Sequence, residues 1–429
     1  MLYSLLGYIM VFSIIYLLFK NKATPLTLFI LFPPLFALLL GFSIKEIGEF
    51  ATIGIHTTMS NALLFMFCIP YFGIVSDAGM FDKIIEKLLS KANDNVISIT
   101  LITIIMTLIC QLGGASTTAL VVIPGLLPIY KKLHIRPAVL ALIIASGMGI
   151  TNLVPWGAPT ARTAIVLGVK ATDIWQRVLP VQIAGIIIVI CSAILLGFRE
   201  KKLIKNLKVL ETEDIQIHKK EILRQPKNVA INLTLTLTLI GILIADIIPS
   251  YIVFMIGFAI ALLINHPDAQ SQNAQFKKHA ATALLLPATM ITSGIFVGII
   301  GETGMLNAMA NTLLYFIPDF LGKYLHIIMG ILSTPIGIAL GADAFYYGLL
   351  PLVIEVGKTY GVDPMNIAIT MLVGKNVSVL ISPLVPSLFL VLSLTGLELN
   401  AHIKFCFKWL FGISILLLLC AIMMGVVII

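Results

Sequence analysis

Charged residues are scarce in this chain of 429 residues. Asp, Glu, Lys and Arg make up 11% of it, whereas apolar residues reach 59%; a typical soluble domain is about 25% charged. A soluble globule of this size buries only about three quarters of its chain surface, so it could not hide so many apolar side chains. The composition therefore excludes a soluble enzyme and a disordered chain, and it predicts a multi-spanning integral membrane protein.

Metal-binding and catalytic motifs are also missing. The five cysteines stand singly in apolar stretches, without CxxC or Cys/His spacing, so the sequence predicts neither a disulfide framework nor a zinc site. HExxH, GxSxG and Walker A motifs are absent, which disfavours a membrane-embedded enzyme and an ATP-driven pump. The net charge of +8 is concentrated, since 14 of the 48 charged residues fall within 199–227. This marks a loop on one side of a membrane, and we expect no nucleic-acid partner.

Long apolar runs dominate what is present. A helix needs roughly 20 residues to cross about 30 Å of hydrocarbon. Runs that meet this requirement lie at 2–19, 23–41, 58–79, 138–168, 175–198, 228–248, 249–265, 281–303, 364–396 and 404–429. We therefore expect an all-α protein embedded in the lipid bilayer, with ten membrane spans.

Two further apolar stretches, 95–131 and 324–354, are each too long for one straight span. Small and polar residues interrupt both near the middle, at residues 113–118 (the first tip) and 341–344 (the second tip). Backbone at membrane depth leaves a helix only where protein or a water-filled cavity receives it. We therefore expect two re-entrant hairpins; the alternative in each case is two ordinary helices joined by a loop.

Helix-breaking residues also interrupt the spans at 138–168 and 364–396. Pairs of prolines with Gly or Ser nearby mark residues 151–162 (the first break) and 374–387 (the second break). Proline removes a backbone donor and clashes with the preceding turn, so a helix unwinds at such a pair. Each half of the chain is thus predicted to contain one broken helix.

The order of these features in the first half recurs in the second, about 225 residues later; Gly147 and Gly374, for example, fall at matching places. This pattern predicts two repeats, 1–198 and 228–429, joined by a cytoplasmic linker at 199–227. With the N-terminus outside, 21 Lys and Arg fall inside and five outside, which agrees with the positive-inside rule. Five spans per repeat, an odd number, make the two repeats inverted.

Inverted repeats with paired discontinuous helices are typical of secondary transporters whose site lies near the bilayer midplane. Two tips and two breaks that meet around one cavity would offer hydroxyls, amides, half-helix N-termini and an arginine. Such groups suit a small carboxylate substrate. The substrate-binding residues predicted on this basis are Ser116, Thr117, Thr118, Asn152, Gly157, Thr160, Arg162, Asn376, Ser378, Ser382 and Ser387.

Three charged residues within the spans have distinct expected roles. Arg162 is predicted to pair with a substrate carboxylate through its planar fork; the alternative is an arginine extended to the outer interface. Lys375 is either a fixed counter-charge or a lysine extended to the interface. Asp343, the only carboxylate at either tip, is predicted to hold the coupling ion, a proton or sodium. The alternative for Asp343 is a cap on a half-helix.

Four linked motifs resemble a known family along nearly the whole chain. They are YFGIVSDAGMFD at 71–82, NLVPWGAPTAR at 152–162, DAFYYGLLP at 343–351 and SPLVPS at 382–387. Together they resemble the citrate–divalent metal–proton symporter (CitMHS) family of the ion transporter superfamily. The resemblance implies ion-coupled uptake of citrate across a bacterial-type cell membrane, usually as a complex with Mg²⁺ or another divalent metal. It also implies a homodimer in which a transport domain moves against a scaffold.

The first tip departs from the family pattern. The family typically carries an Asp-Gly-Asp-Gly-Thr-type run there, whereas this chain has Leu-Gly-Gly-Ala-Ser at 112–116. If those carboxylates help to hold the metal, their absence favours free citrate or another di- or tricarboxylate. Our leading hypothesis is thus an ion-coupled symporter of citrate or a related carboxylate, free or metal-bound, without a resident cofactor. The alternative is a cation exchanger or metalloid-anion permease on the same fold.

Overall fold

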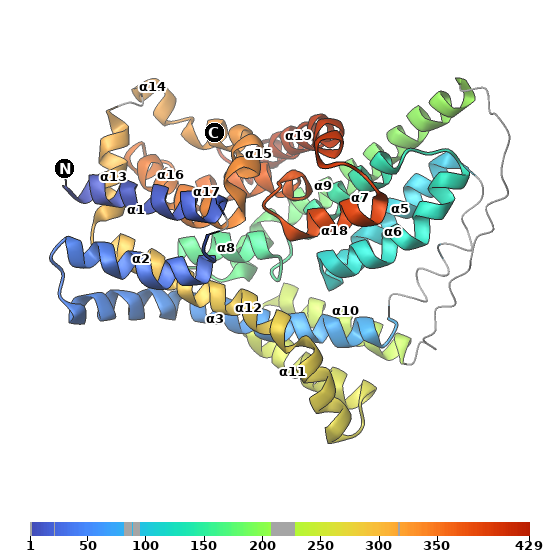
Figure 1. Cartoon of the computed structure of the whole chain (residues 1–429), viewed down its shortest axis with the longest axis horizontal. Helices are drawn as coiled ribbons and strands as arrows, with labels where there is room; N and C mark the ends of the chain where they lie inside the picture. The colour runs from blue at the N-terminus through green and yellow to red at the C-terminus, as the bar shows by residue number, and fades with distance from the viewer. Residues whose placement is uncertain (1, 21, 81–87, 89–94, 207–227, 316–317) are drawn as a thin grey trace.

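The computed structural model describes residues 2–20, 22–80, 88, 95–206, 228–315 and 318–429. Every regular element in these ranges is helical, which confirms the predicted all-α fold (Figure 1). The elements of the first half are α1 (Leu2–Phe19), α2 (Pro25–Leu39), α3 (Ile44–Asp77), α5 (Val96–Cys110), η1 (Gln111–Gly113), α6 (Ala115–Lys132), α7 (Pro137–Thr151), α8 (Ala158–Leu167) and α9 (Ala171–Asn206).

The second half contains helices in a matching order. They are α10 (Val229–Ala245), α11 (Ser250–Asn265), α12 (Ala269–Glu302), α13 (Met305–Leu314), α14 (Asp319–Gly322), α15 (Leu325–Asp343), η2 (Ala344–Leu349), α16 (Leu350–Thr359), α17 (Pro364–Asn376), η3 (Val379–Ile381), α18 (Pro386–Thr395) and α19 (Leu399–Met423). The duplication and the inverted two-fold relation of the halves stay predictions.

Several helices extend beyond the apolar runs that predicted them. The helix α3 begins at Ile44 rather than at 58, because Ser43 and Glu46 form a reciprocal capping box at its start. The helix α12 begins at Ala269 rather than at 281, where the Asp268 side chain accepts a hydrogen bond from the Ser271 amide. Hydropathy alone underestimates the lengths of both helices because their first turns are polar. The helix α9 continues to Asn206, and the rest of the predicted linker, 207–227, lies outside the described residues.

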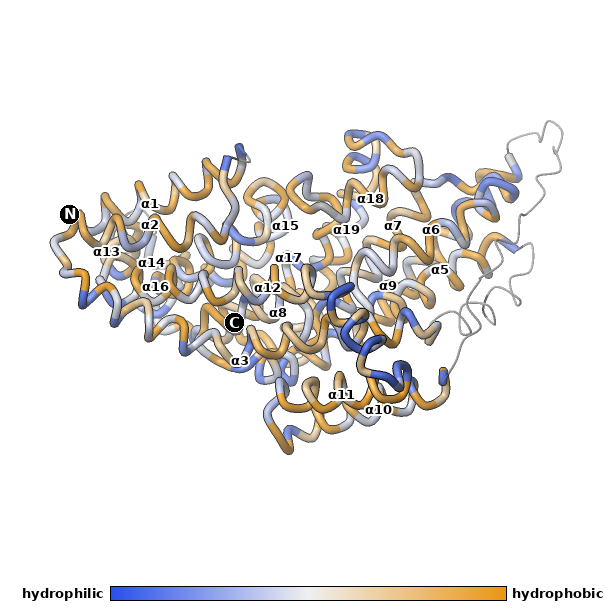
Figure 2. The backbone as a smooth tube through the Cα atoms, turned by 60° about the horizontal axis from the view of Figure 1, so that its bottom comes forward, coloured by the Kyte–Doolittle hydropathy of each residue, from blue (hydrophilic) through white to orange (hydrophobic). Residues whose placement is uncertain are grey.

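Six helical segments in the described residues are both long and apolar enough to cross a membrane unaided. They are 44–77, 96–113, 171–205, 269–302, 325–359 and 399–423. Shorter apolar helices accompany them, including α1, α2, α7, α10 and α11. Large apolar side chains such as Phe12, Leu31 and Ile187 are more than half exposed, as expected of a surface that faces lipid. Figure 2 shows apolar backbone along most helices and hydrophilic segments mainly near their ends.

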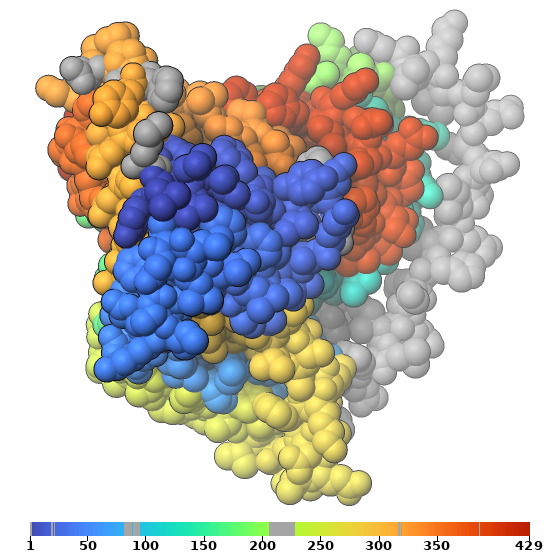
Figure 3. Space-filling view, turned by 60° about the vertical axis from the view of Figure 1, so that its left-hand side comes forward, coloured from blue at the N-terminus to red at the C-terminus, as the bar shows by residue number. Residues whose placement is uncertain are grey.

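The long helices α3 and α12 cross at very close range. A Cβ atom on Gly54 would lie 1.9 Å from the Gly294 carbonyl oxygen, and one on Gly298 would lie 2.4 Å from the Phe50 carbonyl oxygen. Only glycine permits this approach of two backbones. The helix α2 packs on α12 and α11 packs on α3. The N-terminal helices form a continuous outer surface beside this crossing (Figure 3). We call α1, α2, α3, α10, α11 and α12 the scaffold group.

The remaining long elements carry the tips and the breaks. Gly114 joins η1 to α6 at the first tip with φ 97° and ψ 169°, and Gly341 bends α15 at the second tip with φ 75° and ψ −179°. This backbone region is essentially restricted to glycine. The two tips therefore turn the chain in the same way at corresponding places. We call α5 to α9 and α15 to α19, with η1 to η3, the site group.

Candidate functional site

A cavity of about 250 Å³ lies where the first break, the second tip and the second break meet. Its walls combine charged, hydroxyl and apolar side chains. They are Asn152, Ala158, Pro159, Arg162, Gly337, Ala342, Asp343, Tyr346, Lys375, Ser378, Val379, Ser382, Leu384 and Val385. The structure thus brings the first break, in the first half of the chain, together with two segments of the second half.

Side chains satisfy the backbone of the first break. Between α7 and α8, the Thr160 hydroxyl donates to the Leu153 carbonyl at 3.0 Å. The Gln182 amide on α9 donates to the Ile150 carbonyl at 3.1 Å. A Cβ on Gly157 would lie 1.8 Å from the Asn152 carbonyl oxygen, so this turn requires glycine. The unwound segment is consequently held in one conformation by hydrogen bonds, and it directs α8 toward the cavity.

The second break is satisfied in a parallel manner. The Ser378 amide bonds to the Lys375 carbonyl and leaves the Gly374 carbonyl without its helical partner. The hydroxyl groups of Thr334, at 2.7 Å, and Ser414 donate to that Gly374 carbonyl instead. A carbonyl freed by an unwound helix is thus paired inside the protein, as a non-aqueous environment demands. Ser414 lies on α19 and Gln182 lies on α9, the last long helix of each half.

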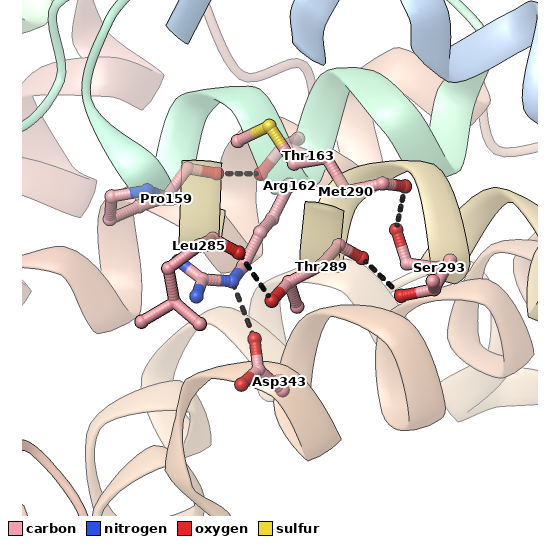
Figure 4. Close-up of polar contacts among 9 residues, drawn as sticks. Pro159, Arg162, Thr163, Leu285, Thr289, Met290, Ser293 and Asp343 are labelled. Carbon is pink, nitrogen blue, oxygen red and sulfur yellow. Dashed lines mark hydrogen bonds and ion pairs between the residues drawn. The ribbon is translucent and has the colours of Figure 1, made fainter. Parts of the chain in front are cut away.

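An ion pair closes one side of the cavity. Arg162 Nε on α8 donates to Asp343 Oδ1 at the second tip, at 2.8 Å (Figure 4). The two side chains are 12% and 22% exposed. This contact argues against an Arg162 that extends to the membrane interface. Asp343 makes no side-chain capping hydrogen bond to the described residues of η2, so the cap alternative fails as well. In the described structure, Arg162 donates a hydrogen bond to Asp343. The terminal NH₂ groups of Arg162 retain donor capacity for a ligand.

Lys375 supplies a second cation. Its Nζ lies 4.9 Å from the ring centroid of Phe345 and 4.8 Å from that of Tyr346, and the residue is 5% exposed. Gly337 makes room for its stem, because a Cβ there would lie 2.5 Å from Lys375 Cε. The lysine therefore lines the cavity instead of extending to an interface. The Tyr346 hydroxyl is buried without a hydrogen-bond partner among the described residues.

The first tip reaches the cavity indirectly. The Thr118 hydroxyl donates to Gln111 Oε1 at 2.8 Å, and Gln111 Nε2 donates to Asn152 Oδ1 at 2.9 Å. Thr117 bonds back to the Gly113 carbonyl at 3.1 Å. The tip thus orients Asn152, which lines the cavity. Gln111 was not among the predicted site residues, although an amide close to a Gly-Gly pair inside an apolar run was a usable signal.

Five of the predicted site residues line the cavity: Asn152, Arg162, Asp343, Ser378 and Ser382. The Ser378 and Ser382 hydroxyls donate to the carbonyls of Lys375 and Ile338, so they offer lone pairs rather than protons. Other predicted residues lie outside the cavity wall: Ser116, Thr117, Thr118, Gly157, Thr160, Asn376 and Ser387. Contact between substrate and any of these residues stays a prediction.

An all-helical membrane fold in which broken helices and a glycine-bent segment enclose a charged cavity is typical of secondary transporters. A family profile described as "Citrate transporter" matches residues 10–374. The chain belongs to this citrate transporter (CitMHS) family. It is accordingly a multi-pass protein of the cell membrane, in a family of transporters rather than enzymes.

Similar proteins from Bacillus subtilis (strain 168) match along nearly the whole chain. One, named citrate transporter, is 35% identical over 427 residues, with 99% of each chain covered. Another, named Mg(2+)/citrate complex secondary transporter, is 33% identical over 428 residues, also with 99% covered. Among solved structures, the YdaH transporter of Alcanivorax borkumensis matches with a TM-score of 0.62 at 17% identity, over 90% of each chain. That likeness shows the fold alone.

Proposed function

We propose that this protein is an ion-coupled secondary transporter that takes up citrate or a related di- or tricarboxylate through the cavity between the two breaks. The observation that carries the proposal is the pair of cations on the cavity wall, Arg162 and Lys375. A guanidinium and an ammonium are the groups that proteins use to hold carboxylates. The names of the two relatives support citrate as the substrate.

Uptake of such an anion needs a co-transported cation. Moving one charge against a membrane potential of 100 mV costs about 2.3 kcal/mol, so a trianion entering a negative interior costs about 7 kcal/mol. Asp343 is the carboxylate on the cavity wall and can accept either a proton or a sodium ion. We propose that Asp343 binds the coupling cation. We also propose that the charge state of Asp343 affects substrate binding by Arg162, because the two residues form an ion pair.

The arrangement of the helices supports an elevator-type movement. Both tips and both breaks belong to the site group, whereas the glycine crossing of α3 and α12 makes the scaffold group a closely packed unit. We propose that the site group moves as one body along the scaffold group and exposes the cavity to each side in turn. We also propose a homodimer in which the scaffold groups of two copies hold each other in place.

Counterflow of labelled citrate tests the transport activity directly. Purified protein is reconstituted into liposomes loaded with unlabelled citrate, and the entry of labelled citrate is followed. We expect entry well above that of protein-free liposomes, with competition by other tricarboxylates. Movement of sodium or protons without any carboxylate dependence would instead show a cation exchanger and contradict the proposal.

A further inference from the structure

Lys375 brings an ammonium group to the cavity wall without an ion-pair partner in the described part of the chain. Its ammonium group faces the rings of Phe345 and Tyr346, and no Asp or Glu in the described part of the chain forms an ion pair with it. An aromatic face stabilises a cation without removing its charge. The residue lines the cavity, so the ammonium is available to an anion bound there.

Ligands for a divalent cation are scarce around the same cavity. Calcium and magnesium ions are held mainly by carboxylate and carbonyl oxygens. Asp343 is the one acidic residue on the described cavity wall, and its Oδ1 already accepts from Arg162. Across the described residues, no three His, Cys, Asp or Glu side chains are grouped so that they could hold a metal ion. A divalent cation in this cavity would meet two cationic side chains and a carboxylate that is already paired.

We propose that the Lys375 ammonium group supplies the positive charge that a metal bound to citrate would otherwise bring, so that this protein transports the metal-free tricarboxylate. The proposal rests on the transport function proposed above and specifies the form of the substrate. Binding Mg²⁺ removes two negative charges from a citrate trianion, and a cavity wall with two cations and one carboxylate attracts the free trianion more strongly. Gly337 leaves the space that the lysine stem occupies.

Counterflow with the intact protein tests the form of the substrate. Exchange of labelled citrate is measured once in EDTA and once with Mg²⁺ in large excess over citrate. We expect exchange to persist in EDTA and to fall severalfold in Mg²⁺, because complex formation depletes the free anion. Exchange that stops in EDTA and returns with Mg²⁺ overturns this proposal and leaves the transport function standing. Exchange that is absent in both conditions contradicts the transport function itself.

The cargo can also be followed through the metal. Radioactive Mn²⁺ supplied with citrate should stay outside the proteoliposomes while citrate enters. Entry of Mn²⁺ that depends on citrate would overturn the proposal, whatever the effect of any substitution.

A substitution then tests the role of the lysine itself. Lys375→Gln keeps a polar side chain and removes the charge, so the Kd for citrate in EDTA, measured by titration calorimetry, should rise about tenfold or more. The matched control is Lys358→Gln, which removes an exposed lysine that pairs with Glu355 at 2.9 Å and lies off the cavity wall; its Kd should not change. Wild-type affinity in a folded Lys375→Gln protein would overturn the proposal. If that variant does not fold, the wild-type EDTA experiment decides.

Discussion

The first and second tips have similar backbones, but the first carries neutral side chains and the second carries a charged one. Gly114 and Gly341 adopt nearly the same left-handed, extended conformation. Around Gly114, neutral side chains bond to one another and hold Asn152. Two residues after Gly341, Asp343 crosses to Arg162 of the first break. One tip therefore supports the cavity, and the other brings charge into it.

This difference shows that the two halves share backbone features but contribute different charges to the site. A glycine at each tip and prolines at each break recur in both halves because they determine the shape of the backbone. The charged residues do not recur. Arg162 comes from the first half, while Asp343 and Lys375 come from the second. The cavity thus combines backbone features that both halves share with charged residues that each occur in only one half.

The largest effect should follow from removal of the carboxylate at the second tip. Asp343→Asn eliminates the group that we propose to bind the coupling cation, so concentrative uptake driven by a proton or sodium gradient should be abolished. Proton coupling predicts that the variant still exchanges citrate, because Asn resembles a protonated carboxyl. Sodium coupling predicts weaker exchange as well, because an anionic ligand is lost.

The matched acid-to-amide control for Asp343→Asn is Glu355→Gln on α16, which lies off the cavity wall and should accumulate citrate normally. If Asp343→Asn accumulates citrate as well as the wild type does, the carboxylate only holds Arg162 in place. The coupling site must then lie elsewhere. Both tips would then have a supporting role, although only the second carries a charged side chain.

A smaller but clear effect is expected at the first break. Arg162→Lys keeps the positive charge and loses the planar fork that pairs with carboxylates. Loss of one charged hydrogen bond, worth about 1.5–3 kcal/mol, should weaken citrate binding about tenfold to a hundredfold in a calorimetric titration. Arg177→Lys on α9, where the arginine is exposed, serves as the control. Unchanged affinity in both Arg162→Lys and Arg162→Gln would show that Arg162 pairs with Asp343 but does not bind the substrate.

Alanine at the two tip glycines compares the tips directly. Both backbones lie in a region that costs other residues about 1–3 kcal/mol, so both variants should lower the melting temperature. At Gly341, the new Cβ would also lie 3.0 Å from Leu384 Cδ1, a side chain of the cavity wall, whereas nothing lies within 4 Å at Gly114. Only Gly341→Ala should also weaken citrate binding. An equal loss of affinity in both variants would contradict the inference that the first tip only supports the cavity.

Much of this architecture could be predicted from the sequence. Apolar runs separated by glycines and prolines predicted the helices, and the paired prolines located the unwound segments that precede α8 and α18. Helix starts were harder to predict, since Ser43 and Asp268 extend α3 and α12 through hydrogen bonds that hydropathy does not measure. A span count cannot be derived from helix length alone, because several apolar helices are too short to cross a membrane unaided.

The site was predicted only in part. Charged residues inside apolar segments are conspicuous, so Arg162 and Asp343 were expected at the site. Their direct contact could not be predicted, because it joins positions 181 residues apart through a particular packing of α8 on η2 and α17. Gln111 escaped notice for a similar reason. Its place close to a Gly-Gly pair was visible in the sequence, but its hydrogen bond joins it to Asn152, 41 residues away, and only the fold brings the two side chains within 2.9 Å.

The smallest effect is expected where the first tip supports the cavity from behind. Thr118 is fully buried, and its hydroxyl donates to Gln111 Oε1. Thr118→Val keeps the shape and leaves that oxygen without this donor, so unfolding should become easier by about 1 kcal/mol. Citrate affinity should fall only about threefold, because Asn152 is positioned less firmly but no ligand contact is lost. Thr107→Val on α5 is the control, since that buried hydroxyl donates to the Thr103 carbonyl of its own helix and lies off the cavity wall. Calorimetry and thermal melting measure both quantities. A loss of affinity as large as that of Arg162→Lys would mean that the hydroxyl run of the first tip touches the substrate, and that both tips take part in binding.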